Sequence, residues 1–307
     1  MNIARYFFLV FLLVSTGVFA QQDFRVTLLG TGDPSIRVDR FGPATLVEVA
    51  GQELLFDVGR GATLRLGQLD ILPTDIDGIF ITHFHSDHVN GLPDLWMSGQ
   101  ITPRARPFEL WGPKGVKSML EHVGMAFEKD AQSRTFGRAP GQKEVEDIAH
   151  EFDESGVVYE KDGVVVTAIA VQHYAFEPSY GYRVDYDGRS VVISGDTTYD
   201  ENLIEAAKGT DLIVHEVFFV SEERLNAPGP ARAIGGIHTS PEDAGTVFSK
   251  VAPKLAVYTH LVTLGTEEPL LDLVARTRTT YDGPLVVGED LMTFVLDGGI
   301  TVLSRKP

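Results

Sequence analysis

The chain of 307 residues contains no cysteine. This absence excludes a disulfide framework, a thiolate metal ligand, a cysteine nucleophile and lipid attachment at a cysteine. Basic residues are also few, because 26 Lys and Arg stand against 43 Asp and Glu, which gives a formal net charge of −17. Such acidity is typical of a soluble protein. It argues against nucleic acid as a partner, because the phosphate backbone is repelled, although a local basic patch around a site is compatible with it.

The sequence also lacks an apolar run long enough to span a membrane. The apolar stretch of residues 6–14 falls short of the roughly 20 residues that a spanning helix needs. It follows Arg5, and small residues surround Ala20, which is the pattern of a secretory signal peptide. We therefore predict that residues 1–20 are a signal peptide. Residues 21–307, with a formal charge of −18, would then work in the periplasm or as a secreted protein, free of the membrane.

Strands and helices alternate along residues 21–307, and no low-complexity linker divides them. Asp187-Gly188 predicts a hairpin turn, and Ser240 before Pro241 predicts the start of a helix. The predicted strands form two sets, each accompanied by helices, so the sequence indicates one α/β domain with helix–sheet–sheet–helix layering. These strands lie within residues 24–34, 44–59, 79–81, 163–173, 180–196, 211–217 and 254–260.

A cluster of histidines follows one of these strands. After the apolar residues 79–81 come His83, His85, Asp87 and His88, so three of the nine histidines fall within six positions. A single histidine is usually exposed or hydrogen-bonded. Three of them beside an aspartate, on a loop held by a strand, indicate a metal site.

Further potential ligands stand at the ends of other strands. His173, Asp196 and His260 each end a predicted strand, as His83 does. A structural hydrogen bond is a reasonable alternative for His173 alone, but the repeated arrangement favours ligands. Imidazole and carboxylate without thiolate suit Zn²⁺, and seven such groups are too many for one tetrahedral ion but suit two.

The motif HxHxDH at residues 83–88, followed by a distant His, an Asp after a strand and a last His, resembles the signature of the metallo-β-lactamase fold. This resemblance implies an αβ/βα four-layer sandwich with the site at one edge. It also implies two zinc ions that share a hydroxide, which attacks an ester, amide or phosphoryl centre. By the same resemblance, His83, His85 and His173 bind one zinc, Asp87, His88 and His260 bind the other, and Asp196 bridges them.

Two further motifs, "LIVHEVFF" and "GIHTSPEDAG", resemble ribonuclease Z, the tRNA 3′-processing endonuclease, and its close relatives. In that branch a Glu and a His that match Glu216 and His238 pair near the metals, and the His protonates the leaving group. A carboxylate beside a histidine keeps its tautomer and tunes its pKa, as this role requires. The resemblance thus makes Glu216 and His238 catalytic, together with Asp87, which would orient the hydroxide. Alternatively, His238 is a neighbour of a helix cap and Glu216 a core residue; His215 is predicted to be structural.

Ribonuclease Z itself is disfavoured by its tRNA-gripping arm, which lies between the segments that match His173 and Asp196, because here only 22 residues separate them. An exported arylsulfatase-like branch of the fold is resembled most by the stretches "THFHSDHVNGLPDLW", "WGPKGVKSMLEHVGMAF", "HTSPEDAGTVF" and "KLAVYTHLV". We therefore predict an exported dizinc hydrolase that cleaves sulfate or phosphodiester esters of small molecules, without nucleic acid as a partner. Two alternatives stand beside it: a lactonase or carboxylic-ester hydrolase, and a non-catalytic periplasmic protein that binds a metal or a ligand.

Two minor features complete the predictions. A homodimer is left open by the sequence. Residues 118–134 read as a helical segment that would cap the pocket with Met125 and Phe127, with an ordinary packed helix as the alternative.

Overall fold

The computed structural model describes residues 24–101, 106–133, 146–174, 176–266 and 268–304. The predicted signal peptide lies outside these residues, so the signal peptide and the periplasmic or secreted location stay predictions. Within the described ranges, no helix is long and apolar enough to cross a membrane.

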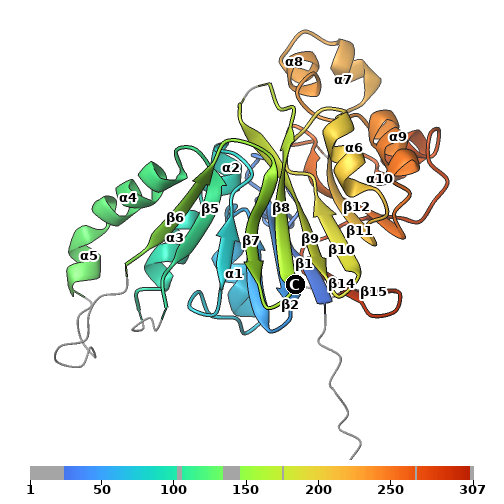
Figure 1. Ribbon diagram of the computed structural model, residues 1–307. Coiled ribbons are helices and arrows are strands. Elements are labelled where there is room, and N and C mark those ends of the chain that lie inside the picture. Colours follow the sequence, from blue (N-terminus) through green and yellow to red (C-terminus); the bar gives the residue numbers. More distant parts are fainter. Residues whose placement is uncertain (1–23, 102–105, 134–145, 175, 267, 305–307) are drawn as a thin grey trace, which may run out of the picture.

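Two sheets lie at the centre of the molecule (Figure 1). In the part of the chain that the structure describes, one sheet has eight strands in the order β15-β14-β1-β2-β3-β4-β5-β6, and the other has seven in the order β13-β12-β11-β10-β9-β8-β7. The first sheet contains β1 (Phe24–Gly30), β2 (Ala44–Val49), β3 (Gln52–Phe56), β4 (Gly78–Phe80), β5 (Glu109–Pro113), β6 (Ile148–Phe152), β14 (Met292–Leu296) and β15 (Ile300–Ser304). The second contains β7 (Gly156–Lys161), β8 (Val164–Val171), β9 (Ser179–Tyr186), β10 (Arg189–Ile193), β11 (Leu212–Phe218), β12 (Leu255–Val262) and β13 (Leu285–Val287).

Helices cover the outer face of each sheet (Figure 1). Leu66, Trp96 and Leu120 of three helices pack against the first sheet, and Ile204, Phe248 and Leu273 of three others pack against the second. The four layers are therefore helix, sheet, sheet and helix, which confirms the predicted αβ/βα sandwich. The helices are α1 (Ala62–Gln68), α2 (Ser86–Val89), α3 (Leu92–Ser98), α4 (Val116–Ala126), α5 (Glu128–Ser133), α6 (Glu201–Ala207), α7 (Glu222–Asn226), α8 (Ala231–Gly235), α9 (Pro241–Val251) and α10 (Leu270–Thr277).

The core between the sheets lies directly behind the histidine loop. The rings of Phe56 and Phe80 stack with centroids 4.9 Å apart, and the ring of Tyr182 from the opposite sheet lies 5.7 Å from that of Phe80. The Tyr182 hydroxyl donates to the carbonyl of Ile81 at 2.6 Å. Each ring buried in this way stabilises the fold by about 1.5–3 kcal/mol, so the residues that precede His83 are held firmly.

The parallel strands bring the predicted ligands to one edge of the molecule. In the second sheet β10, β11 and β12 run parallel, and every residue of β11 and β12 is buried, as expected for strands covered on both faces. Polar residues that follow or end such strands must therefore meet at the carboxyl edge. The short segments after β4, β8 and β10 carry His83, His173 and Asp196 to that edge.

His260 reaches the same edge by a different route. The sequence places it at the end of a strand, but β12 continues to Val262. At His260 the backbone φ is +42°, and the pairing with β11 shifts register, so that two residues of β12 oppose one of β11. Such a bulge turns a side chain away from the regular alternation, and here it turns the imidazole into the site.

Gly195, next to Asp196, lies at a close contact between the two sheets. Its φ is +60°, and a Cβ at this position would lie 2.5 Å from the Tyr180 carbonyl oxygen and 3.2 Å from the Thr82 side chain. The amide of Tyr180 in turn donates to the carbonyl of Thr82 at 3.0 Å. Only glycine allows this approach, which sets Asp196 against the histidine loop.

Candidate metal centre and active site

Seven side chains converge at the carboxyl edge in two adjacent groups, and within each group the potential ligand atoms lie within 4.8 Å of one another. The first group is His83, His85, His173 and Asp196, and the second is Asp87, His88 and His260. The two carboxylate oxygens of Asp196 face different groups: Oδ2 lies 3.6 Å from His83 Nε2, and Oδ1 lies 3.3 Å from His88 Nε2. The structure thus brings together all seven predicted ligands, with Asp196 between the groups.

Hydrogen bonds on the outer side of two rings direct their inner nitrogens toward the site. His173 Nδ1 donates to the carbonyl of Ile237 at 2.8 Å, and His88 Nδ1 donates to Asp57 Oδ2 at 2.7 Å. In its neutral form each ring carries its one proton on Nδ1, so that Nε2 presents a lone pair to a metal. Burial would lower the pKa of His88, but the carboxylates of Asp196, Asp57 and Asp87 together raise it well above its usual value, so a metal must displace a proton from this ring. His85 Nδ1 also lies close to other ring nitrogens, at 2.9 Å from His83 Nε2 and 3.1 Å from His173 Nε2.

Several buried atoms at the centre have no hydrogen-bond partner among the described residues. They include His88 Nε2 and Asp196 Oδ1, which lie 3.3 Å apart and face each other. Buried polar atoms are normally satisfied, and orphaned lone pairs that converge on one point are what a cation would bind. The donor set of imidazole and carboxylate is the one that Zn²⁺ takes. The cluster therefore fits a metal site.

The charges at this centre depend on one another. Burial would lower the pKa of His260, but the carboxylates of Asp196 and Asp87 together outweigh burial and raise the pKa to about 9. Burial would raise the pKa of Asp87, but His88 and His260 outweigh it and lower the pKa to about 2. In the metal-free protein, a proton on His260 thus balances the buried carboxylates, which is the role that a bound cation would take over.

Metal binding should accordingly release protons. The raised pKa of His260 keeps its proton bound below about pH 9, and metal binding must displace that proton. We expect zinc affinity to rise roughly tenfold per pH unit up to about pH 9 through this group alone, and then to level off. Titration calorimetry at pH 7 in two buffers of different ionisation enthalpy should detect the release of one proton or more. Binding heats that do not depend on the buffer would contradict this expectation.

Asp57 orients His88 and was missed by the sequence analysis. Besides its contact with His88 Nδ1, its carboxylate accepts from the amide of Thr82 at 2.9 Å through Oδ1. The signal was present, because Asp57 directly follows a strand, as the other site residues do. Its φ is +58°, a conformation that Asp and Asn adopt more readily than most residues.

Asp57→Asn should therefore lower metal affinity by roughly 10- to 100-fold without unfolding the protein. An amide that accepts from Thr82 with its oxygen must turn its NH₂ group toward His88 Nδ1, which forces the other tautomer and removes the inner lone pair. Competition with a coloured zinc chelator measures the affinity. Asp211→Asn is the matched control, because Asp211 is also buried and accepts from a backbone amide, that of Ser190. Equal affinities in the two variants would contradict the role of Asp57.

His238 and Glu216 form a buried pair beside the metal-type ligands. His238 Nδ1 donates to Glu216 Oε1 at 2.9 Å, and the His238 ring lies 5.2 Å from that of His173 and 5.8 Å from that of His260, centroid to centroid. Burial would lower the pKa of His238, but the Glu216 carboxylate outweighs it and raises the pKa above its usual value. The pair can hold a proton next to the two ligand groups.

His215 points away from the metal-type ligands. Its Nδ1 donates to the carbonyl of Glu216 at 2.7 Å, and its ring packs edge-on against Phe248 of α9, with centroids 5.7 Å apart. The residue belongs to the layer between the second sheet and its helices, apart from the cluster.

Residues 118–133, the described part of the predicted segment 118–134, lie in α4 and α5, with Phe127 between the two helices. The α4 helix buries Val116 and Leu120, whereas α5 buries none of its described side chains. Met125 is exposed, and Phe127 lines a surface cavity with Asn90, Pro93 and Met97. The role of the segment as a cap stays a prediction.

Comparison with known proteins agrees with this geometry. Residues 53–261 match the family described as Beta-lactamase superfamily domain. The chain is 31% identical over 275 residues to ribonuclease Z of Mycobacterium marinum, an alignment that covers 87% of this chain and 96% of the relative.

Solved structures show the same fold. The metallo-beta-lactamase fold protein YhfI from Bacillus subtilis matches with a TM-score of 0.68 and 16% identity, over 89% of this chain and 99% of that protein. The short form of human tRNase Z matches with a TM-score of 0.66 and 23% identity, over 88% and 98% of the two chains.

These findings correct the predicted substrate and partner. The curated relatives are ribonucleases, so a hydrolase of small sulfate or phosphate esters that has no nucleic-acid partner is the wrong prediction, and neither alternative to it gains support. The argument from a missing arm failed because little of the mycobacterial relative lies outside the alignment. The argument from net charge failed because total charge describes the whole surface, not the site.

A family match over most of the chain thus accompanies the seven converging ligands, the His238–Glu216 pair and the four-layer sandwich. Membership of this superfamily supports the assignment of the protein as a metal-dependent hydrolase. The chain belongs to the beta-lactamase superfamily and, within it, to the ribonuclease Z family.

Proposed function

We propose that the protein is a zinc-dependent phosphodiesterase that hydrolyses RNA. The observation that carries the proposal is the buried His238–Glu216 pair beside two groups of metal-type ligands. A phosphodiester in RNA has a poorly leaving alkoxide, so its hydrolysis needs a proton donor as well as an activated nucleophile. The ribonuclease Z relatives support RNA as the substrate class.

Seven residues would hold two zinc ions, in the two groups given above, with one oxygen of Asp196 toward each group. Zinc bound there supplies a hydroxide at neutral pH and positive charge beside the phosphoryl oxygens. The protein's contribution is a rigid and largely buried frame. Asp57, Thr82 and the Ile237 carbonyl fix the ring orientations from outside.

Leaving-group protonation would fall to His238. Its proton on Nδ1 is held by Glu216, and Glu216 is itself fixed by the amide of Thr197, which donates to Oε1 at 3.0 Å. The charged imidazolium is stabilised by the carboxylate, so the second ring nitrogen can donate to the departing oxygen and the ring can regain its proton from solvent. Asp87 contacts His260 at 3.2 Å and would help to orient the nucleophile.

The acidic composition does not oppose this function. At physiological ionic strength, charges farther than about 8 Å apart are largely screened, so the phosphate backbone responds to the groups nearest to it. Metal ions in the site are the largest local charges and reverse the sign there.

Cleavage of RNA by purified residues 21–307 tests the proposal. The zinc-loaded protein should cut end-labelled RNA, including a tRNA precursor with a 3′ extension, and a chelator should stop the reaction. Asp196→Ala, purified in the same way, controls for a contaminating nuclease. Gel analysis that shows all RNA intact, with zinc bound and a bis(4-nitrophenyl) phosphate substrate still hydrolysed, would overturn RNA as the substrate.

A further inference from the structure

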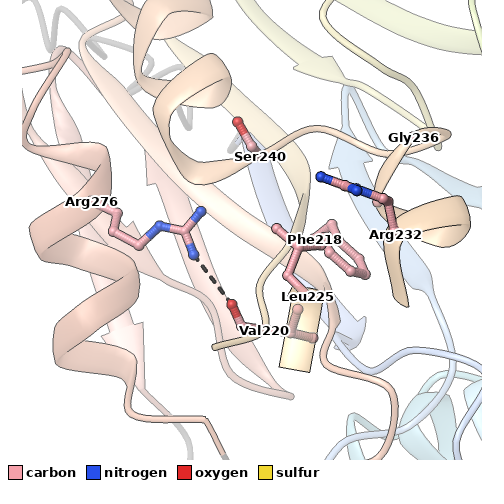
Figure 2. A pocket seen from close by; sticks show the side chains of 8 residues that line it. Phe218, Val220, Leu225, Arg232, Gly236, Ser240 and Arg276 are labelled. Carbon is pink, nitrogen blue, oxygen red and sulfur yellow. Dashed lines mark hydrogen bonds between the residues drawn. The ribbon is translucent and has the colours of Figure 1, made fainter. Parts of the chain in front are cut away.

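A cavity of about 260 Å³, which none of the seven metal-type ligands lines, lies beside Phe218 (Figure 2). The end of β11, the helices α7 and α8, Ser240 at the start of α9 and Arg276 of α10 surround it. The ring of Phe218 in its wall lies nearly parallel to the ring of His238, with centroids 6.5 Å apart. An occupant would therefore sit one ring away from the proposed acid. The cavity is smaller than the roughly 300–1,000 Å³ typical of pockets for drug-sized ligands, so it suits a single ring system.

The floor of this cavity is apolar. Phe218 and Val220 belong to a small buried cluster against which Leu225 packs. Planar bases stack readily on aromatic rings and pack well against such a floor, whereas a bare phosphate would lose its hydration there without compensation.

Two arginine side chains flank the cavity, and they differ in whether a neighbouring carboxylate balances their charge. Arg276 is balanced, because it pairs with both carboxylate oxygens of Glu242 at 2.7 and 2.9 Å. Arg232 is exposed, and its side chain has no hydrogen bond or ion pair with any residue that the structure describes. Figure 2 shows its side chain directed inward, over Phe218. The mouth of the cavity thus carries one unbalanced positive charge beside an apolar floor.

We propose that this cavity binds a nucleotide of the RNA next to the scissile phosphodiester. The base lies against Phe218 and Leu225, and a phosphate of the same strand pairs with Arg232, because guanidinium groups bind phosphate with charge-assisted hydrogen bonds. The inference rests on the proposed function, since it names the substrate as RNA. An uncharged apolar ligand would leave Arg232 unused, and a free anion would leave the floor unused.

Binding of adenosine 5′-monophosphate to the zinc-loaded protein tests the cavity directly by calorimetry. Arg232→Gln should weaken it roughly 10- to 100-fold, the usual loss for a hydrogen bond to a charged group. Adenosine should bind the parent and Arg232→Gln with equal affinity. Inorganic phosphate should also bind both with equal affinity, because it would bind at the metal site. Leu225→Ala should weaken the binding of adenosine and of its monophosphate by the same factor.

Lys129→Gln is the charge-matched control, because Lys129 is an exposed cation on α5, far from α7 and α8 (Figure 1). Equal affinity of the monophosphate for parent and Arg232→Gln would overturn the inference, as would an equal loss for inorganic phosphate.

Kinetics separate this inference from the proposed function. Arg232→Gln should raise KM for an RNA oligonucleotide and leave kcat unchanged. It should not affect hydrolysis of bis(4-nitrophenyl) phosphate, because that substrate has no phosphate besides the scissile one for Arg232 to bind. Equal losses on both substrates would overturn the nucleotide pocket. If the parent cleaves no RNA, the proposed function fails. In that case, monophosphate binding that depends on Arg232 would still support a nucleotide pocket, and binding that does not would overturn it.

Discussion

Asp196→Ala is expected to lose bound zinc and catalytic activity together. Asp196 reaches both ligand groups, with Oδ2 3.6 Å from His83 Nε2 and Oδ1 3.3 Å from His88 Nε2. Its removal takes one anionic ligand from each site and the negative charge that offsets two cations. Activity should fall by at least about 10³-fold, because metal ions supply several kcal/mol of transition-state stabilisation. Elemental analysis of the purified variant gives the metal content, and cleavage of a phosphodiester gives the activity.

The matched control is Asp200→Ala, four residues farther along the chain. Asp200 is equally buried, but its carboxylate caps α6 through the amides of Asn202 and Leu203. Its loss should cost about 1 kcal/mol of stability and no zinc. Thermal unfolding adds a readout that is independent of turnover: excess zinc should raise Tm in the parent and in Asp200→Ala, and should have little effect in Asp196→Ala. A variant at Asp196 that kept close to two zinc ions and full activity would remove the metal mechanism.

The metal-type cluster was predictable because its signal is local. Within residues 83–88 the spacing of His and Asp fixes the chemistry, and strand ends in parallel sheets meet at one edge whatever the details of packing. His173 and Asp196 followed from the same rule. The fold class followed from alternating strands and helices with two buried faces to cover.

Other features depend on the packed structure and could not be read from the sequence. His260 enters the site through a bulge in β12 with a positive φ, whereas the sequence suggested an ordinary strand end. The contact of Asp57 with His88 joins residues 31 positions apart through loops whose path the sequence does not reveal. The pocket near Phe218 is lined from β11, α7, α8, the cap of α9 and α10, so its volume is a property of their packing alone.

The predicted substrate failed for a related reason. Net charge and the length of one connection describe the chain as a whole, and neither reports the groups that touch a substrate. The pair Glu216 and His238, by contrast, pointed toward ribonuclease Z, the family to which the chain belongs. Short motifs that carry chemistry were better guides to the branch than global properties.

His238→Ala should keep the zinc ions and still lose most activity toward poor leaving groups. The side chain lies beside the ligands, and its Nδ1 is bound to Glu216 at 2.9 Å, so its removal deletes a proton donor and leaves the seven ligands in place. Turnover of RNA should fall by roughly 10²- to 10⁴-fold, the usual range for a lost general acid. Esters of nitrophenol should lose much less, because a nitrophenolate departs without a proton.

Leaving-group and pH dependence distinguish this acid role from a structural one. In His238→Ala, the rate should depend more steeply on leaving-group pKa than in the parent. The Glu216 carboxylate raises the pKa of His238 above its usual value, so the parent should lose activity as the pH rises through that pKa, and the variant should lack this decline. Glu216→Gln should show the same changes as His238→Ala in milder form, because the imidazole remains but is less well stabilised when charged. His215→Ala, on the same strand but packed against Phe248, should lower stability without changing the leaving-group slope. If His238→Ala slowed good and poor leaving groups equally with zinc still bound, His238 would bind substrate and would not protonate the leaving oxygen.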